Sequence, residues 1–201
     1  MAIFVLTGTP GTGKSSIANY FAKKKSIIID LNKLVNKKHL WYTKEKGSKV
    51  VDIASLQREV IKEIFRIKNK YKHKISKESN NVNNIIIEGH LACEITLPVD
   101  AVIVLRTRPD ILVKRLIKRK YPKYKISENV QVEIIDYCTR KAEENYNCPI
   151  YEIDSSGSIR VTINKINTLI KKILNRDKIV NSPINWMRYA FNKEVAKYLF
   201  E

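Results

Sequence analysis

The feature that most constrains the fold is the amino-terminal segment, in which an apolar run leads directly into a glycine-rich loop. Residues 2–8 read AIFVLTG, residues 8–16 read GTPGTGKSS, and a helical pattern continues to Lys24. The loop matches the pattern G-x-x-x-x-G-K-S, with strand, loop and helix in the order that this phosphate-binding motif requires. A glycine-rich turn without function would not need all of these positions filled. The segment therefore predicts a phosphate-binding loop.

The residue types of this loop suit a chain of phosphates. Gly8, Gly11 and Gly13 permit positive φ, so that successive backbone N–H groups can form a cradle for anions. The helix N-terminus adds positive potential, and the Lys14 ammonium can reach the β- and γ-phosphates. Ser15 is the hydroxyl expected on Mg²⁺, and Ser16 is placed for the α-phosphate. The residues predicted to bind ATP are Gly11, Thr12, Gly13, Lys14, Ser15 and Ser16.

The rest of the chain alternates short apolar runs with longer helical patterns, as expected for β-α-β units and a parallel sheet. The β-branched content of the short runs favours strands. The predicted strands are residues 2–8, 26–30, 84–90, 101–106 and 150–154. The predicted helices are residues 15–24, 52–74, 127–147, 158–176 and one that begins at Pro109, with a solvent loop at 73–84. This order predicts an α/β fold with a five-stranded parallel sheet flanked by helices.

Length and composition favour one soluble domain. The chain has 201 residues, of which 44% are hydrophobic and 29% charged. No apolar run reaches the ~20 residues that a transmembrane helix needs, and the start of the chain is too short in apolar residues for a signal peptide. We therefore expect a cytoplasmic protein. The three cysteines lack the paired spacing of a zinc site.

The formal net charge of +18 makes a polyanion such as RNA a natural partner. A solvated lysine surface without such a partner is the alternative. The basic residues are dense between Lys114 and Lys125, where no acidic residue occurs. Arg115 and Arg119 are one helical turn apart and share a face, which favours a closing lid that supplies charge to a phosphoryl group. A solvated basic helix is again the alternative.

Acidic residues at predicted strand ends are candidates for the chemistry. In an open parallel sheet, ligands bind beyond the carboxyl ends of the strands. Glu88 ends the third predicted strand and can hold Mg²⁺ or orient an attacking oxygen, although a helix cap is an alternative. His90 can orient a water or a phosphate, or it can be structural. Asp30 and Asp52 bracket a segment where a second substrate could bind.

The last segment carries apolar residues at four-residue spacing. Met187, Phe191, Val195 and Leu199 would share one face of a helix. We expect a docked C-terminal helix, and a partner-binding surface is the alternative.

Four segments together resemble one known family. They are GTPGTGKSS, IIIEGH, VIVLRTRPDILVKRLIKRKY and KISENVQVEI. In this order they resemble the atypical adenylate kinases of archaea and eukaryotic nuclei, a family that includes the coilin-interacting nuclear ATPase. The resemblance runs from residue 2 to about residue 174. It implies a P-loop NTPase fold with an arm that binds a nucleoside monophosphate (NMP) and a lid.

The resemblance also implies an activity and a set of site residues. The family has adenylate kinase activity, ATP + AMP to two ADP, together with ATPase activity, and acts in small-subunit rRNA maturation with the ribosomal protein uS11. Carried over, the catalytic residues are Lys14, Glu88, His90 and Arg119, of which Arg119 contacts ATP, and the Mg²⁺ ligands are Ser15 and Glu88. The arm would lie near 28–51 and the lid near 118–128, and Asp30 and Asp52, which bracket the segment after the second strand, are the candidate NMP-binding residues.

Two departures from the family pattern accompany this resemblance. Lys120 stands where the family has glycine after the lid arginine, and Glu88 stands where eukaryotic members have aspartate. The predicted organisation is one kinase domain at 1–176 and a C-terminal helical extension at 177–201. The leading hypothesis is an NMP kinase, and the alternative is mainly a ribosome-assembly ATPase switch that binds uS11 and RNA.

Overall fold

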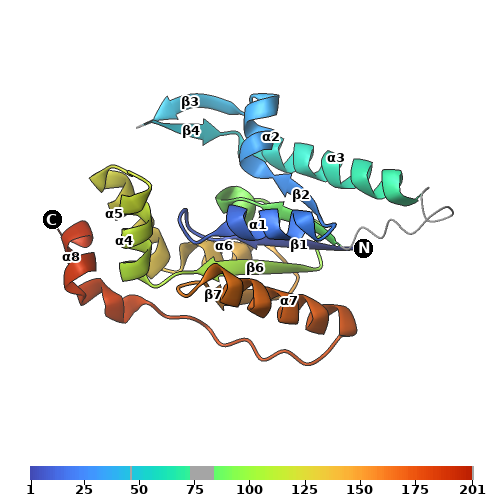
Figure 1. Cartoon of the computed structure of the whole chain (residues 1–201). Helices are drawn as coiled ribbons and strands as arrows, with labels where there is room; N and C mark the ends of the chain where they lie inside the picture. The colour runs from blue at the N-terminus through green and yellow to red at the C-terminus, as the bar shows by residue number, and fades with distance from the viewer. Residues whose placement is uncertain (46, 73–83, 201) are drawn as a thin grey trace.

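Five strands form one parallel sheet in the order β2-β5-β1-β6-β7 in the computed structural model, which describes residues 1–45, 47–72 and 84–200. The strands are β1 (Ala2–Thr7), β2 (Ile27–Asp30), β5 (Asn84–Glu88), β6 (Ala101–Arg106) and β7 (Ile150–Asp154). Each of the five predicted strands is present, and the predicted fold class is confirmed. Because β1 lies in the centre, the loop that follows it opens at the middle of the sheet edge (Figure 1).

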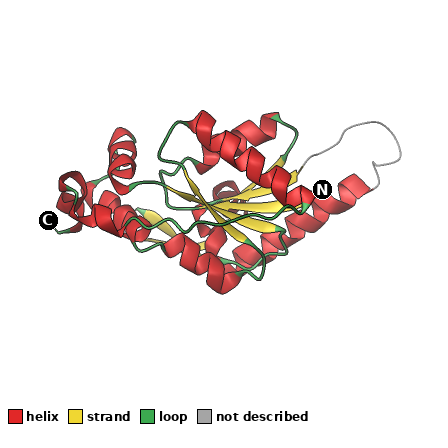
Figure 2. Ribbon diagram, turned by 90° about the horizontal axis from the view of Figure 1, so that it is seen from below, coloured by secondary structure: helices red, strands yellow, loops and turns green. Residues whose placement is uncertain are grey.

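Helices cover both faces of this sheet (Figure 2). Side chains alternate along β1, so Ile3 and Val5 face one core while Phe4 and Leu6 face the other. The first core is covered by α2 (Leu31–Lys38), α3 (Ile53–Lys72), the 3₁₀ helix η1 (His90–Glu94) and α6 (Tyr137–Asn145). The second is covered by α1 (Lys14–Lys23) and α7 (Ile159–Asn175). Each fully buried Ile, Leu or Phe contributes about 1.5–3 kcal/mol, which makes the sheet a rigid base for its edge loops.

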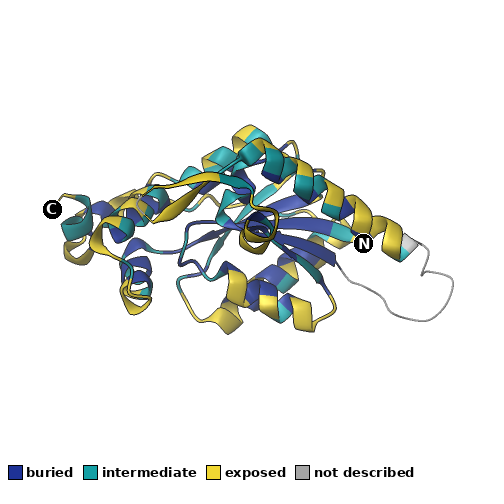
Figure 3. Cartoon of the chain, turned by 90° about the horizontal axis from the view of Figure 1, so that it is seen from above, coloured by how far each residue is buried: buried dark blue, intermediate teal, exposed yellow. Residues whose placement is uncertain are grey.

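A two-stranded antiparallel hairpin lies apart from the main sheet. It consists of β3 (Trp41–Glu45) and β4 (Ser48–Val51), joined through Gly47 at a φ of 73°. The hairpin and α2 were not predicted as elements within the segment after β2. Most of the hairpin is exposed on both faces (Figure 3), so its sequence lacks the alternation that marks a half-buried strand.

The helix predicted at 127–147 is wrong, because the structure has two helices there. α5 (Lys123–Ile134) ends before Asp136, whose φ of 58° interrupts the helix, and α6 begins at Tyr137. The Asp136 carboxylate forms an ion pair with the buried Arg106 guanidinium, a distant contact that selects this break. The preceding helix, α4 (Pro109–Lys118), follows the prediction.

The prediction of a single C-terminal helix is also wrong. Residues 176–186 form no helix, and they lead to a short 3₁₀ helix, η2 (Met187–Phe191), and to α8 (Lys193–Leu199). The Asn192 side chain accepts a hydrogen bond from the Glu194 N–H and caps α8, so the chain turns at that point. Phe191 is 82% exposed whereas Val195 is completely buried. The apolar stripe is therefore divided between solvent and the surface of α4 and α5 (Figure 1).

Two further expectations concern a solvent loop and the absence of membrane-spanning helices. The predicted solvent loop at 73–84 lies outside the described residues except for Asn84, which begins β5 and is buried. Within the described ranges, no helix combines the length and the apolar character that crossing a membrane requires.

Candidate active site

The loop between β1 and α1 has the geometry of an anion cradle. Gly8, Gly11 and Gly13 have φ values of 131°, 101° and 101°, which residues with side chains rarely adopt. A Cβ on Gly11 would lie 2.7 Å from Cδ1 of Leu112, so the loop also needs glycine to pack against α4. Gly13 caps α1, and the helix N-terminus therefore faces the centre of the loop.

Lys14 lies inside the loop rather than in solvent. Its side chain is buried, and Nζ donates to the carbonyl oxygens of Gly8 at 2.6 Å and Thr9 at 3.0 Å. Burial lowers the pKa of Lys14, and this effect is opposed by nearby acidic groups that include Glu88. A phosphate anion placed in the cradle would provide Lys14 with a stronger partner than a carbonyl.

The three hydroxyl residues of the motif have different roles. Ser15 and Ser16 are exposed on the first turn of α1, where their hydroxyls can reach a ligand. The Thr12 hydroxyl instead donates to the Thr9 carbonyl at 2.9 Å inside the loop. Of the predicted ATP-binding residues, Thr12 is thus committed to holding the loop, because its backbone N–H also donates to the Thr9 carbonyl, at 3.2 Å.

Two carboxylates meet beyond neighbouring strand ends. Asp30 and Glu88 are paired in the register of β2 and β5, and Glu88 and Ser15 line the same cavity at the phosphate-binding loop. Burial, and then the charge of Asp30, raises the pKa of Glu88. Asp30 itself caps α2, accepting from the Lys33 N–H at 3.0 Å. The strand-end argument thus brings Glu88 to the loop, as predicted.

These oxygen donors fit a magnesium ion. Mg²⁺ prefers carboxylate and hydroxyl oxygens and is commonly held by one or two protein groups together with phosphate oxygens. Ser15 supplies a hydroxyl and Glu88 a carboxylate, and both line the cavity that contains Lys14. Among the residues that the structure describes, no group of three or more His, Cys, Asp or Glu forms a metal site by itself. The donor set therefore suits a metal that enters with phosphates.

His90 begins η1 next to this acidic pair. Burial, and then the Lys14 charge, lowers the pKa of His90 to about 4. The imidazole is therefore neutral at physiological pH, and it can donate one hydrogen bond and accept another. Its backbone carbonyl accepts from Cys93 Sγ at 3.1 Å, which holds the start of η1 in place.

This shift predicts a pH-dependent stability. Between pH 6.5 and about 4 the unfolded chain binds a proton at His90 and the folded protein does not, so stability is full above this window and falls as the pH drops through it. We expect a loss of up to about 3 kcal/mol at the acidic end. Urea titrations of wild type and His90→Asn across this range measure it. The same loss in both proteins would contradict the assignment, and His39→Asn, at an exposed histidine, is the control.

The basic residues come from the end of α4. Burial lowers the pKa of Arg115, and the nearby positive charge of Arg119 lowers it further. The two arginines therefore share a face of α4, as predicted. The Arg115 guanidinium donates to the carbonyl oxygens of Ser155 at 2.8 Å and Gly157 at 3.2 Å. Arg115 thus holds the loop after β7, whereas Arg119 is exposed at the phosphate-binding loop.

Lys120 adopts a left-handed backbone conformation that favours glycine. Its φ of 58° lies in the left-handed region, where a side chain adds strain. The tight turn that follows α4 is therefore retained with a lysine at this position, and it leads through Pro122 into α5.

Three adjoining cavities surround the phosphate-binding loop. The loop cavity, of about 300 Å³, is lined by the loop with Glu88, His90 and Arg119. The β7 cavity, of about 450 Å³, lies between the loop, Arg119 and the residues after β7. The hairpin cavity, of about 630 Å³, extends from His90 to the hairpin and α5. The loop cavity shares residues with each of the other two, so it lies between them.

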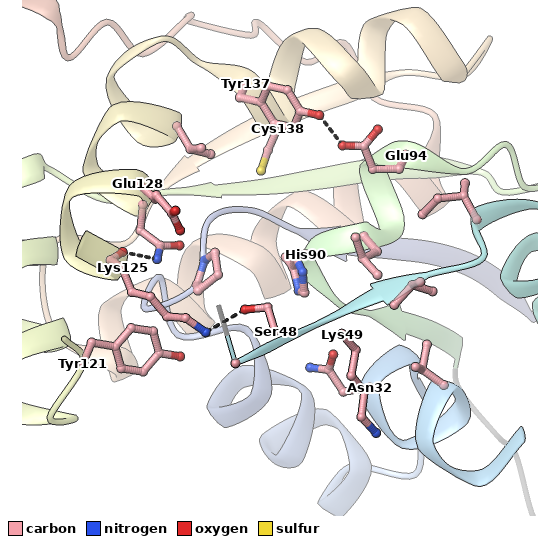
Figure 4. A pocket seen from close by; sticks show the side chains of 18 of the residues that line it. Asn32, Ser48, Lys49, His90, Glu94, Tyr121, Lys125, Glu128, Tyr137 and Cys138 are labelled. Carbon is pink, nitrogen blue, oxygen red and sulfur yellow. Dashed lines mark hydrogen bonds between the residues drawn. The ribbon is translucent and has the colours of Figure 1, made fainter. Parts of the chain in front are cut away.

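The hairpin cavity is bridged by a contact between distant segments. Figure 4 shows Lys125 pointing across the cavity to Ser48, and Nζ donates to Oγ at 2.6 Å. At the far wall, the Tyr137 hydroxyl donates to the Glu94 carboxylate at 2.5 Å. The cavity is therefore polar at both ends and lined by groups that can hydrogen-bond a ligand.

Several lining residues were missed by sequence reasoning. Ser155 and Gly157 follow β7, and the strand-end argument applied to that strand could have found them. Asn32, Ser48 and Asn129 line the hairpin cavity without any local sequence signal.

Asp52 does not line the hairpin cavity. Its carboxylate accepts from the Ser55 N–H at 3.0 Å and the Ser55 hydroxyl at 2.6 Å. These two bonds, and then the interaction with Tyr42, lower the pKa of Asp52 to about 2. Asp52 therefore stabilises the start of α3.

Comparisons with known proteins found a matching family model, related sequences and a structure of similar extent. A family model described as an AAA domain matches residues 4–136. A protein from Methanosarcina acetivorans named "Putative adenylate kinase" is 38% identical over 84% of this chain and 86% of its own length. A protein of the same name from Pyrococcus furiosus is 32% identical over 92% of this chain and 97% of its own length. A shikimate kinase structure from Bacteroides thetaiotaomicron has a TM-score of 0.47 at 18% identity, covering 85% of this chain and 98% of that one.

Proposed function

The chain belongs to the AAA-domain family matched at residues 4–136 and to the family of these adenylate kinase relatives, and we propose that it transfers a phosphoryl group from ATP to AMP. The family membership makes it a phosphate-loop kinase of the NMP kinase type. The preference for AMP, the ATPase activity and any role beyond metabolism are proposals.

The observation that carries the proposal is the order of the three cavities. Phosphoryl transfer needs donor and acceptor oxygens in line at a charged centre. The loop cavity is lined by Lys14, Glu88 and Arg119, and it shares lining residues with both the β7 cavity and the hairpin cavity. We assign the nucleoside of ATP to the β7 cavity and the acceptor to the hairpin cavity.

The residues of the loop cavity have different roles in phosphoryl transfer. Lys14 and Arg119 supply positive charge to the migrating phosphoryl group, which carries most of the transition-state charge. Glu88 orients the metal or the attacking oxygen from a buried position. Neutral His90 can hydrogen-bond an acceptor oxygen without adding charge.

Ser15 and Glu88 would hold Mg²⁺ together with the phosphates of ATP. When bound, the ion neutralises phosphate charge. The protein supplies the geometry, because the loop and both strand ends are fixed by the packed sheet.

The hairpin cavity suits a nucleotide in size and polarity. A volume of about 630 Å³ falls within the usual range of roughly 300–1,000 Å³ for small-molecule sites. Asn32, Asn36 and Asn129 offer amide groups that can read a base edge, and Lys125 offers a cation for the acceptor phosphate. The predicted arm and lid contribute the hairpin and the start of α5 to this cavity. When water replaces the acceptor, the same transfer is the proposed ATPase activity.

An acceptor screen tests the proposal. Purified protein with ATP and Mg²⁺ is given each nucleoside monophosphate in turn, and ADP formation is followed above the acceptor-free rate. We expect AMP to give the largest increase. We also expect Asn32→Ala to raise the KM for AMP more than the KM for ATP. Asn164→Ala, on the exposed side of α7, is the matched control. The absence of stimulation by every monophosphate would overturn the kinase proposal.

A second candidate function is an assembly ATPase that acts on the small ribosomal subunit with uS11 and rRNA. The net charge of +18 supports a polyanionic partner. Binding to small-subunit rRNA and to uS11 is measured between low and physiological salt, where an electrostatic complex weakens steeply. Failure to bind either partner at low salt would contradict this candidate.

A further inference from the structure

A buried ionic cluster lies behind the phosphate-binding loop and takes no direct part in the proposed chemistry. Its centre is Arg106, which is 1% exposed at the end of β6. The guanidinium Nε donates to the Glu133 carboxylate at 3.0 Å, and the two Nη atoms form ion pairs with Asp136 and Glu152. Buried charges are costly unless they are paired and hydrogen-bonded, and all three carboxylates of this cluster contact the one guanidinium.

Glu133 extends this cluster to the phosphate-binding loop. It is 1% exposed, and one oxygen accepts from the Thr107 N–H at 2.8 Å while the other accepts from the Thr9 hydroxyl at 2.5 Å. The carbonyl of Thr9 in turn accepts from Lys14 Nζ at 3.0 Å and from the Thr12 hydroxyl at 2.9 Å. Thr9 is thus the point where α5 fixes the loop.

The C-terminal segment, residues 184–199, is bound to the same cluster. The Ile184 carbonyl accepts from Arg106 Nη1 at 3.2 Å, and the Ile184 N–H donates to Glu152 Oε2 at 2.6 Å. Further along, Ala190 and Val195 are buried in an apolar cluster with residues of α4 and α5. The segment therefore contacts both the helix that carries Glu133 and the guanidinium that Glu133 pairs with.

We propose that the C-terminal segment controls nucleotide binding by the phosphate-binding loop, through the contacts that link Ile184, Arg106, Glu133 and Thr9. Arg106 and Glu133 are positioning residues in this scheme, because they act through Thr9. The proposal rests on the proposed function only in that the loop binds MgATP.

The physical reason is that Arg106 and Glu133, which are paired with each other, contact Ile184 on one side and Thr9 on the other. When the segment leaves, Arg106 loses a carbonyl partner and α4 and α5 lose part of their apolar cover. Glu133 then no longer holds Thr9 in a single position, and the cradle must be ordered when nucleotide binds. By linkage, bound nucleotide must strengthen the docking of the segment by the same factor.

The test compares two lysine substitutions in the same segment. Val195→Lys places a charge in the buried cluster, whereas Phe191→Lys changes a residue that is 82% exposed. By calorimetry, we expect Val195→Lys to raise the Kd for MgATP roughly 5- to 50-fold and Phe191→Lys to leave it within about 2-fold. Equal Kd values for wild type and Val195→Lys, with the segment shown to be undocked by proteolysis, would overturn the proposal.

A second pair of variants tests the route through Thr9. Thr9→Val removes the hydroxyl that Glu133 binds, and Thr9→Ser keeps it. We expect Thr9→Val to raise the Kd for MgATP and Thr9→Ser to leave it close to the wild-type value. In the Val195→Lys background, Thr9→Val should raise the Kd little further. Fully additive effects would exclude this route. The KM for the acceptor should change less than the KM for ATP in each variant.

The reciprocal measurement needs no substitution. Hydrogen exchange at residues 184–199 of the wild-type protein should slow when MgATP is added, by a factor similar to the loss of affinity in Val195→Lys. Unchanged exchange at saturating MgATP would contradict the coupling. If the wild-type protein bound no MgATP at all, the proposed function itself would fail, which distinguishes the two outcomes.

Discussion

Lys14→Ala should lower kcat/KM for phosphoryl transfer by about 10²–10³-fold, the usual effect of removing one preorganised donor to transition-state charge. Nζ is the cation held at the centre of the loop, between the carbonyl oxygens of Gly8 and Thr9. The loss should appear in both kcat and the KM for ATP. Steady-state kinetics with MgATP and AMP measure it.

The fold should tolerate this substitution. Burial lowers the pKa of Lys14, so the desolvation cost of the charged side chain offsets part of the hydrogen bonding that is lost from the carbonyl oxygens of Gly8 and Thr9. We therefore expect the melting temperature to fall by only a few degrees, which thermal unfolding measures. Lys23→Ala, at the exposed end of the same helix, is the matched control. A kcat/KM within about 3-fold of wild type in Lys14→Ala would contradict the assigned role.

Glu88→Gln should lower kcat by roughly 10²-fold while the protein remains folded. The substitution keeps the shape of the side chain and removes the charge that would hold Mg²⁺ next to Ser15. The Mg²⁺ concentration for half-maximal activity should rise as well. A magnesium titration at fixed ATP and AMP measures both effects.

The pH dependence gives an independent reading of Glu88. Because its pKa is raised by burial and by Asp30, the activity of the wild-type protein should fall on the acidic side at a higher pH than an ordinary carboxylate would give. Glu88→Gln should lose this acidic limb. Asp100→Asn is the control, because Asp100 accepts from the Ile3 N–H at 2.7 Å at the opposite end of β1. An unchanged Mg²⁺ requirement and acidic limb in Glu88→Gln would exclude the assignment.

Most of the sheet could be predicted because its signals are local. The run Ile85–Ile86–Ile87 is buried from both faces of a parallel sheet, and such a strand reads as a continuous apolar segment. The phosphate-binding loop could be predicted for the same reason, since its glycines define backbone angles residue by residue.

One error came from a residue whose conformation depends on a distant partner, and two came from local caps that the periodic pattern does not reveal. Nothing next to Asp136 in the chain announces a helix break, which depends on pairing with Arg106 thirty residues away. The four-residue spacing of Phe191 and Val195 predicted a common face, but the Asn192 cap turns the chain between them. Asp52 looked like a substrate ligand, although its carboxylate is used by Ser55.

The amino-acid sequence by itself therefore determined the phosphate-binding loop, the strands of the sheet and the place of Glu88 at a strand end, because each leaves a signal within a few consecutive residues. Only the tertiary structure decided the three cavities, the bridge from Lys125 to Ser48 and the buried link from Thr9 to Glu133. These features join positions 77 and 124 residues apart. A pairing over such distances leaves no periodic trace in the chain, and it forms only when packing of the whole sheet brings the segments together.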